Sequence, residues 1–181
     1  MSKLFIPVLL GTIRQGRKSE AVAKYIESEL AKRDGVETIA VDPRELNLPG
    51  DGSDAKDPKY SDITKRADAF FVVTPEYNHS FPGSLKRMLD SEYPNYKYKP
   101  VAVAGVSSGA WGGIRAVQSL MPALRKFGLV LLQEDVHVTH SNEAFDEQGN
   151  PTNEHLESSV NKTIDELILL ATALQSVRIA K

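Results

Sequence analysis

Three short polar stretches of the sequence combine side chains and glycines that could hold a small ligand. The first, Gly11–Ser19, directly follows an apolar run and precedes a helical pattern. It contains the hydroxyls of Thr12 and Ser19 and the guanidinium groups of Arg14 and Arg17. A helix N-terminus offers unpaired N–H groups and partial positive charge, and arginine matches the oxygens of a phosphate group. This stretch is therefore predicted to bind phosphate.

A nucleoside-triphosphate site is the first alternative for this stretch, and it is disfavoured. Gly11 and Gly16 have the G-x-x-x-x-G spacing of a P-loop, but Arg17 stands where the lysine belongs. The pair Lys18-Ser19 therefore comes one place late. The third apolar run also ends without an aspartate that could hold magnesium. A second alternative, a solvated and capped helix start with no ligand, stays open.

The second stretch, Thr74–Gly83, reads T-P-E-Y-N-H-S-F-P-G. It follows Ala69–Val73, an unbroken apolar run typical of a strand buried on both faces, and precedes the helical pattern Ser84–Leu89. A loop at the carboxyl end of a central parallel strand is where open α/β sheets bind ligands. Stiffened by proline at both ends, it could hold backbone amides against a flat, polar-edged ligand. The alternative is a turn in which Ser80 caps the next helix. The candidate binding residues are Pro75, Glu76, Tyr77 and Asn78.

The third stretch, S-S-G-A-W-G-G, leaves the apolar run Val101–Val106. Its glycines let the backbone approach a ligand closely, and its serines can donate hydrogen bonds. It lacks the G-x-G-x-x-G spacing of a dinucleotide site. Trp111 could lie over a ligand or pack on the loop, and His79 in the second stretch could contact substrate or solvent. The candidate binding residues are Ser107, Ser108, Gly109, Gly112 and Gly113.

Alternating strand and helix patterns must position these stretches. Together they predict one doubly wound α/β domain, residues 1–181, with a five-stranded parallel sheet in the flavodoxin-like order 2-1-3-4-5 and helices on both faces. In that order the loops after the first, third and fourth strands converge. FMN combines a phosphate with a flat polar ring, so one loop suited to phosphate and two suited to such a ring together predict an FMN site. Pro7 should interrupt the first strand, and Glu134-Asp135 the fifth. The expected strands are Leu4–Leu10, Val36–Val41, Ala69–Val73, Val101–Val106, and Leu129–Leu132 with Val136–His140; the expected helices are Ser19–Lys32, Pro58–Arg66, Ser84–Leu89, Ile114–Phe127 and Glu154–Ser176.

Composition narrows the class of function. The net charge of −2 and the sequence pI of about 6.1 argue against nucleic acid or an anionic membrane as partner. The absence of cysteine excludes disulfides and thiolate catalysis and fits a cytoplasmic protein. Leu4–Leu10 lacks the flanks of a signal peptide, and Leu167–Leu170 is far too short to span a membrane. His137 and His140 are an odd number of residues apart on the expected strand, so we expect no metal site.

Three motifs resemble the NAD(P)H-dependent FMN reductases, a family that also includes quinone, azo-dye and chromate reductases. They read G-T-I-R-x-G-R-x-S, T-P-E-Y-N-x-S-x-P-G-x-L-K and S-S-G-x-x-G-G, in this order along the chain. One departure is plain, since similar proteins continue L-K-N-x-x-D-W where this chain has L-K-R-M-L-D-S. The resemblance implies that Thr12, Arg14, Arg17 and Ser19 bind the FMN phosphate, that Pro75, Glu76, Tyr77 and Asn78 line the ring, and that Ser107, Ser108, Gly109, Gly112 and Gly113 meet its pyrimidine edge.

The activity implied by this resemblance is hydride transfer from NADPH or NADH, through bound FMN, to a small acceptor. The acceptor would be a quinone, a free flavin, an azo compound or a metal oxyanion, with ping-pong kinetics. We expect no side chain to act as an obligatory acid or base, because the cofactor carries the chemistry. The resemblance also implies a homodimer or homotetramer. Two alternatives stay open: an electron carrier like flavodoxin, and a flavin-binding module without turnover.

Overall fold

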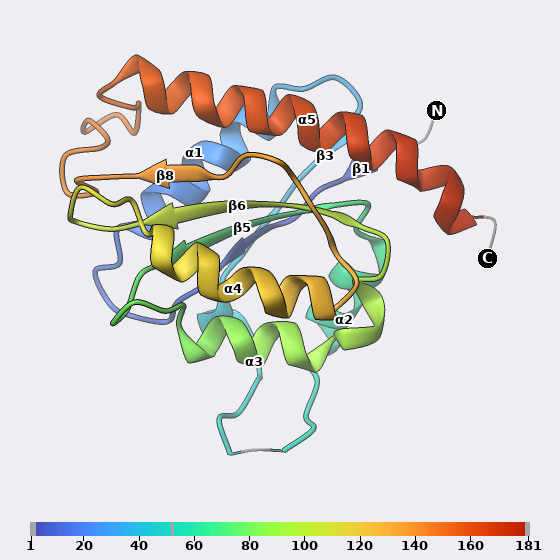
Figure 1. The fold of residues 1–181 in the computed structure, drawn as a ribbon. Helices are drawn as coiled ribbons and strands as arrows, with labels where there is room; N and C mark the ends of the chain where they lie inside the picture. Colours follow the sequence, from blue (N-terminus) through green and yellow to red (C-terminus); the bar gives the residue numbers. More distant parts are fainter. Residues whose placement is uncertain (1–2, 52, 180–181) are drawn as a thin grey trace.

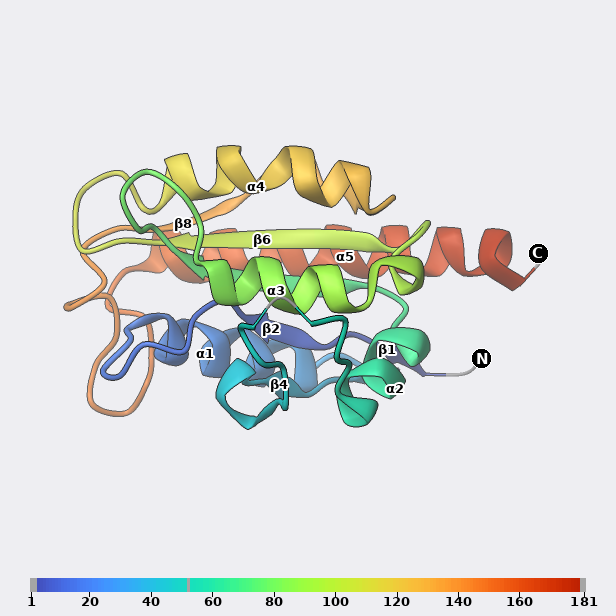
Figure 2. The ribbon, with the colours of Figure 1, turned by 90° about the horizontal axis from the view of Figure 1, so that it is seen from below.

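A computed structural model describes residues 3–51 and 53–179 and shows a parallel sheet between two layers of helices (Figures 1 and 2). Five α-helices lie within these residues, together with two short 3₁₀ helices, Pro43–Glu45 and Tyr93–Asn95. The strands are β1 (Leu4–Phe5), β2 (Val8–Leu10), β3 (Val36–Glu37), β4 (Ala40–Val41), β5 (Phe70–Pro75), β6 (Pro100–Val106), β7 (Val130–Leu131) and β8 (Val136–Val138). The helices are α1 (Ser19–Ala31), α2 (Pro58–Arg66), α3 (Gly83–Ser91), α4 (Ile114–Lys126) and α5 (Glu154–Ile179).

The strand order confirms the predicted topology. The six-stranded sheet runs β4-β2-β5-β6-β7, with β8 also paired to β6, and every pairing is parallel. β1 and β3 pair in parallel just before β2 and β4 along the chain. The predicted first strand is thus β1 with β2, the second is β3 with β4, and the fifth is β7 with β8. This is the order 2-1-3-4-5.

Both predicted strand interruptions are present. Pro7 lies between β1 and β2 because it has no N–H to give to the ladder, although its carbonyl still accepts the N–H of Phe71 at 3.1 Å. The fifth strand breaks over residues 132–135. The fifth strand also ends earlier than predicted: β8 ends at Val138, and His140 lies beyond it with a positive φ of 45°.

The two faces of the sheet carry separate hydrophobic cores. α1 and α5 cover one face, whereas α2, α3 and α4 cover the other (Figures 1 and 2). The helical periodicity of the sequence explains this. Ile26 of α1 and Ile164 of α5 pack into the first core, and Leu85 and Met88 of α3 pack into the second. No helix in the described part of the chain combines the length and apolarity needed to cross a membrane.

The start of α3 shows that one alternative considered from the sequence, a helix capped by Ser80, is wrong. Pro82 is the N-cap residue of this helix, and no side chain caps it, so Ser80 does not have the capping role considered from the sequence. The Ser80 hydroxyl instead shares a hydrogen bond of 3.1 Å with Ser119 of α4. α3 also runs two residues past the predicted end, to Ser91.

The three polar stretches lie where the topology predicts. They follow β2, β5 and β6 and gather at the carboxyl ends of these strands, at the left of Figure 1, while both termini lie at the opposite end. Below they are called the phosphate loop (residues 11–18), the ring loop (residues 75–82) and the glycine loop (residues 107–113).

Candidate functional site

The phosphate loop and the ring loop touch through three of the predicted residues. The hydroxyl of Thr12 lies 2.9 Å from the hydroxyl of Tyr77 and accepts the backbone N–H of Arg14 at 3.2 Å. The guanidinium of Arg14, which is exposed, lies 5.7 Å from the centroid of the Tyr77 ring. The structure therefore brings residues 65 positions apart in the sequence to one surface.

The N-terminus of α1 has no side-chain cap. Lys18 is its N-cap residue and provides no side-chain hydrogen bond. Ser19, which is 1% exposed, has a buried hydroxyl oxygen without a hydrogen-bond partner among the described residues. An unsatisfied buried hydroxyl costs about 1–3 kcal/mol. A ligand with acceptor oxygens would satisfy both the hydroxyl and the free N–H groups of the helix, so the residues fit a phosphate.

Arg17 is buried and bonded within the protein. Its side chain is only 2% exposed and is held by Asp42, with Nη1 and Nη2 at 3.0 and 2.5 Å from the two carboxylate oxygens. It also donates to the carbonyl of Thr12 and, at 3.3 Å, to Glu20. Most of its donors are thus engaged inside the protein, where they join the phosphate loop to Asp42 and Glu20. The sequence reading missed Asp42, because nothing local links it to a loop 25 residues earlier.

The Arg17–Asp42 pair should make stability depend on pH. Burial by itself would raise the pKa of Asp42, but hydrogen bonds from Arg17 and Arg44 hold this pKa well below its ordinary value. The charged carboxylate therefore stabilises the fold above the unfolded-state pKa of about 3.9, and this contribution is lost as the pH falls. We expect Asp42→Asn to be less stable than the wild type near neutral pH, with a difference that narrows below about pH 4.

Urea unfolding of the wild type and of Asp42→Asn, near neutral pH and again below about pH 4, measures this difference in stability. Asp90→Asn is the control, because Asp90 forms only an exposed pair with Lys86 and such pairs contribute at most about 1 kcal/mol. A stability difference for Asp42→Asn that is the same at both pH values would refute the assignment.

The ring loop is a two-residue hairpin turn. Tyr77 and Ser80 exchange backbone hydrogen bonds of 2.8 and 3.0 Å. Between them, Asn78 and His79 both have positive φ, 49° and 67°. This is the pattern of a type I′ turn, which asparagine tolerates better than most residues. Asn78 thus has a backbone reason for its identity in addition to any ligand contact. Both turn side chains are exposed.

The glycine loop is packed against β6 and β8 at its C-terminal end. A Cβ on Gly113, which has φ of 77°, would lie 2.5 Å from the nitrogen of Val106. A Cβ on Gly112, with φ of 55°, would lie 2.8 Å from Cβ of His137. Close packing therefore explains these two glycines, whereas a Cβ on Gly109 would meet open space. The accessible part of the loop is residues 107–111, whereas Gly112 and Gly113 are buried.

A glutamate joins the ring loop to the glycine loop. The carboxylate of Glu76 accepts the backbone N–H of Arg115, in the first turn of α4, at 3.1 Å. The guanidinium of Arg115 in turn lies 5.6 Å from the ring centroid of Trp111, which is 65% exposed. Arg115 is a second residue that the sequence reading missed. Thr12 thus joins the phosphate loop to the ring loop, and Glu76 joins the ring loop to the helix that follows the glycine loop.

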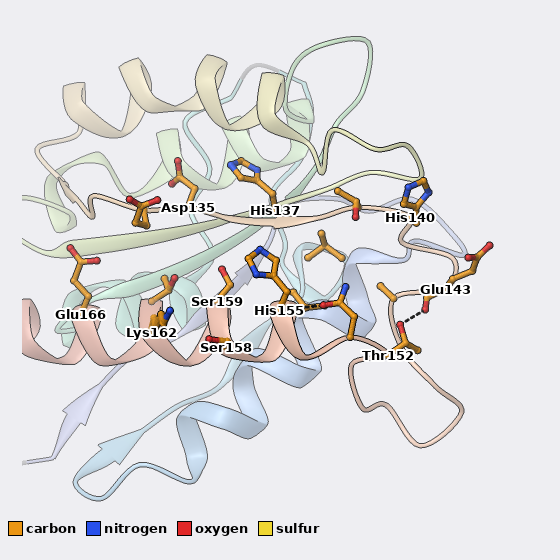
Figure 3. A pocket seen from close by; sticks show the side chains of 17 residues that line it. Asp135, His137, His140, Glu143, Thr152, His155, Ser158, Ser159, Lys162 and Glu166 are labelled. Carbon is orange, nitrogen blue, oxygen red and sulfur yellow. Dashed lines mark hydrogen bonds between the residues drawn. The ribbon is translucent and has the colours of Figure 1, made fainter.

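A cleft of about 1000 Å³ opens beside this site, between β8 and α5 (Figure 3). His155 and Glu166 extend from α5 toward the segment that carries Asp135 and His137, and these residues line the cleft together with Lys162. None of the predicted cofactor residues lines it. The cleft adjoins the glycine loop through His137, which contacts Gly112, and through His140, whose N–H donates to the carbonyl of Gly109. The cleft thus borders the glycine loop but is not lined by the predicted cofactor residues.

The described residues contain no group of three or more histidine, cysteine, aspartate or glutamate side chains that could hold a metal ion. His137 instead directs Nδ1 to the carbonyl of Gly112 at 3.3 Å. This contact joins β8 to the glycine loop.

Solved structures define the class of fold. The flavoenzyme FerB of Paracoccus denitrificans, an NAD(P)H:(acceptor) oxidoreductase, superposes with a TM-score of 0.80 and 24% identity, over 94% of this chain and 98% of that protein. An archaeal flavodoxin superposes with a TM-score of 0.64 and 15% identity, over 92% and 99% of the two chains. The fold is flavodoxin-like.

The sequence comparisons define the family. Residues 5–143 match the family described as NADPH-dependent FMN reductase, and the chain belongs to that family. A quinone reductase of Pseudomonas putida is 34% identical over 135 residues, which cover 68% of this chain and 72% of that protein. An NADPH azoreductase of a Bacillus species is 32% identical over 122 residues, covering 65% and 66%. Family membership confirms the resemblance and the class: an oxidoreductase that works with FMN and NAD(P)H.

Proposed function

We propose that the chain, acting as one domain over residues 1–181, binds FMN and passes hydride from NADPH or NADH to a small acceptor, a quinone in the first instance. The observation that supports this most is the N-terminus of α1, uncapped and carrying the unpartnered hydroxyl of Ser19 in a buried position. The contact of Thr12 with Tyr77 joins this phosphate site to a loop suited to a flat ring.

The roles of the residues follow from where they lie. Thr12, Arg14, Ser19 and the first N–H groups of α1 would hold the phosphate, with Arg17 positioning Thr12 through its carbonyl. The backbone of Pro75, Glu76, Tyr77 and Asn78 would line the ring, and Ser107, Ser108 and Gly109 its pyrimidine edge. Gly112 and Gly113 let the loop pack closely enough to form that edge. Bound FMN supplies the ability to accept and pass on hydride.

The protein's own contribution is alignment. Hydride transfer needs close approach and orientation more than proton transfer, so no side chain is required as acid or base. If reductant and acceptor use the same exposed surface in turn, the kinetics are ping-pong. Initial rates at several fixed quinone concentrations should then give parallel double-reciprocal lines against NADPH. Intersecting lines would contradict ping-pong kinetics, and turnover that requires a protein partner would favour the flavodoxin-like electron carrier.

Arg14→Ala should weaken FMN binding by about tenfold to a hundredfold, because a hydrogen bond to a charged group contributes roughly 1.5–3 kcal/mol. Riboflavin, which lacks the phosphate, should lose much less. Fluorescence titration of the apoprotein with both ligands measures the two losses. Lys24→Ala provides a control, since Lys24 is an exposed cation of α1 that pairs with Glu20 outside the phosphate loop. Equal losses for FMN and riboflavin would place Arg14 away from the phosphate.

We further propose a homodimer or homotetramer in the cytoplasm. The lack of cysteine is compatible with a reducing compartment. Tyr93 is 47% exposed beside α3, and aromatic residues are enriched at interfaces. Light scattering of the purified protein tests the assembly, and a monomeric mass would contradict it.

A further inference from the structure

The side chain of Glu76 links the two loops proposed to hold the flavin ring. It is 12% exposed, and Oε2 accepts the backbone N–H of Arg115 at 3.1 Å. Oε1 lies 3.6 Å from Nη1 of the same arginine. The backbone N–H of Glu76 donates to the carbonyl of Val106 at 3.1 Å, just before the glycine loop. A single residue of the ring loop is thus bonded on both sides of the glycine loop.

The glutamate also replaces a missing helix cap. The N-cap residue of α4 is Gly113, which has a left-handed backbone and no side chain. The N-cap residue therefore offers no side-chain acceptor to the first turn of α4, and the carboxylate of Glu76 supplies one to Arg115 from 39 residues away. Removing this carboxylate should loosen the glycine loop relative to the ring loop.

The charge of Glu76 has a second consequence. The N-terminus of α4 carries partial positive charge, and Arg115 adds a full charge beside it. Both favour negative charge nearby, and reduction places additional negative charge on a flavin bound between these loops. The Glu76 carboxylate offsets this positive potential. It should therefore disfavour the reduced form of the cofactor relative to the oxidised form.

We propose that Glu76 is a positioning residue that fixes the spacing of the ring loop and the glycine loop and, through its charge, lowers the midpoint potential of the bound flavin. This inference rests on the proposed function, because it requires FMN between these loops. A lower potential makes the reduced cofactor a stronger donor to the acceptor. The carboxylate would thus adjust the reaction without touching a reacting atom.

Two substitutions separate position from charge. Glu76→Gln keeps an oxygen that can accept the N–H of Arg115 but removes the negative charge, whereas Arg115→Met removes the positive charge and keeps the N–H. Glu76→Gln should raise the midpoint potential by about 30 mV, a tenfold change in the equilibrium between the two forms of the cofactor. Arg115→Met should lower it. Glu76→Ala, which loses the acceptor as well, should in addition weaken FMN binding by about tenfold.

The readouts are the FMN dissociation constant and the potential measured by equilibration with a reference dye. Glu143→Gln serves as the control for a general charge effect, because Glu143 is exposed and lines the cleft beside α5, outside the ring loop; it should shift the potential by less than a third as much. An unchanged potential in Glu76→Gln, or shifts of the same sign in Glu76→Gln and Arg115→Met, would overturn the inference. Failure of the wild-type protein to bind FMN would instead overturn the proposed function.

Discussion

Replacing Ser19 by alanine should make the protein without FMN more resistant to unfolding and, at the same time, weaken its binding of FMN. The buried hydroxyl of Ser19 has no partner in the described part of the chain, and an unsatisfied group of this kind costs about 1–3 kcal/mol. Alanine removes that cost and favours the helix. The same hydroxyl is proposed to donate to the phosphate, so the loss in FMN affinity should be about tenfold to a hundredfold.

Higher stability without FMN combined with weaker FMN binding would indicate that the Ser19 hydroxyl serves ligand binding and not folding. Chemical denaturation without FMN and titration with FMN measure the two effects. Ser28→Ala is the matched control on the same helix, since the hydroxyl of Ser28 is already bonded to the carbonyl of Tyr25 at 2.7 Å. That variant should neither gain stability nor lose affinity. If Ser19→Ala binds FMN as tightly as the wild type, Ser19 is not a phosphate ligand.

Gly113→Ala should destabilise the protein by roughly 2–5 kcal/mol. The left-handed backbone costs a residue other than glycine about 1–2 kcal/mol. The added Cβ would lie 2.5 Å from the backbone nitrogen of Val106, inside the sheet. A rigid strand cannot move away, and overpacking of this kind costs about 1–3 kcal/mol more. A loss of this size removes a large part of the stability of a typical domain.

Gly109→Ala tests the same loop without the strain. A Cβ at Gly109 would meet no atom within 4 Å, so the midpoint of urea unfolding should stay close to that of the wild type. The two alanines, four residues apart, should differ by several-fold in their effect on stability. Similar small effects of both would show that Gly113 does not hold the glycine loop on β6.

The order of the elements could be predicted because each carries a local signal. Unbroken apolar runs mark the central strands, and helical periodicity marks the cover of each face. Pro7 predicts its own strand break, since a missing N–H has the same consequence in any sheet. The end of β8 was harder, because Val136–His140 has the composition of a strand throughout, whereas only its first three residues pair with β6.

The residues of the candidate site could be chosen from the sequence, but the contacts among them could not. Thr12, Arg14, Ser19 and Tyr77 were chosen by type, and the structure gathers them at one end of the sheet. The engagement of Arg17 by Asp42 and of Glu76 by Arg115 joins residues far apart in the chain. A single sequence contains no local pattern for such pairs. Charged groups in a polar loop can meet a ligand or one another, and only their positions in space distinguish the two.

The central claim is that the chain itself carries FMN and turns over without a protein partner. The most direct test mixes the FMN-loaded protein with NADPH in the absence of oxygen and then adds a benzoquinone. We expect stoichiometric FMN to stay bound through gel filtration, NADPH to bleach its visible absorbance, and the quinone alone to restore it. A protein that retains no FMN, or whose bound FMN is neither bleached by NADPH nor restored by the quinone, would contradict this claim.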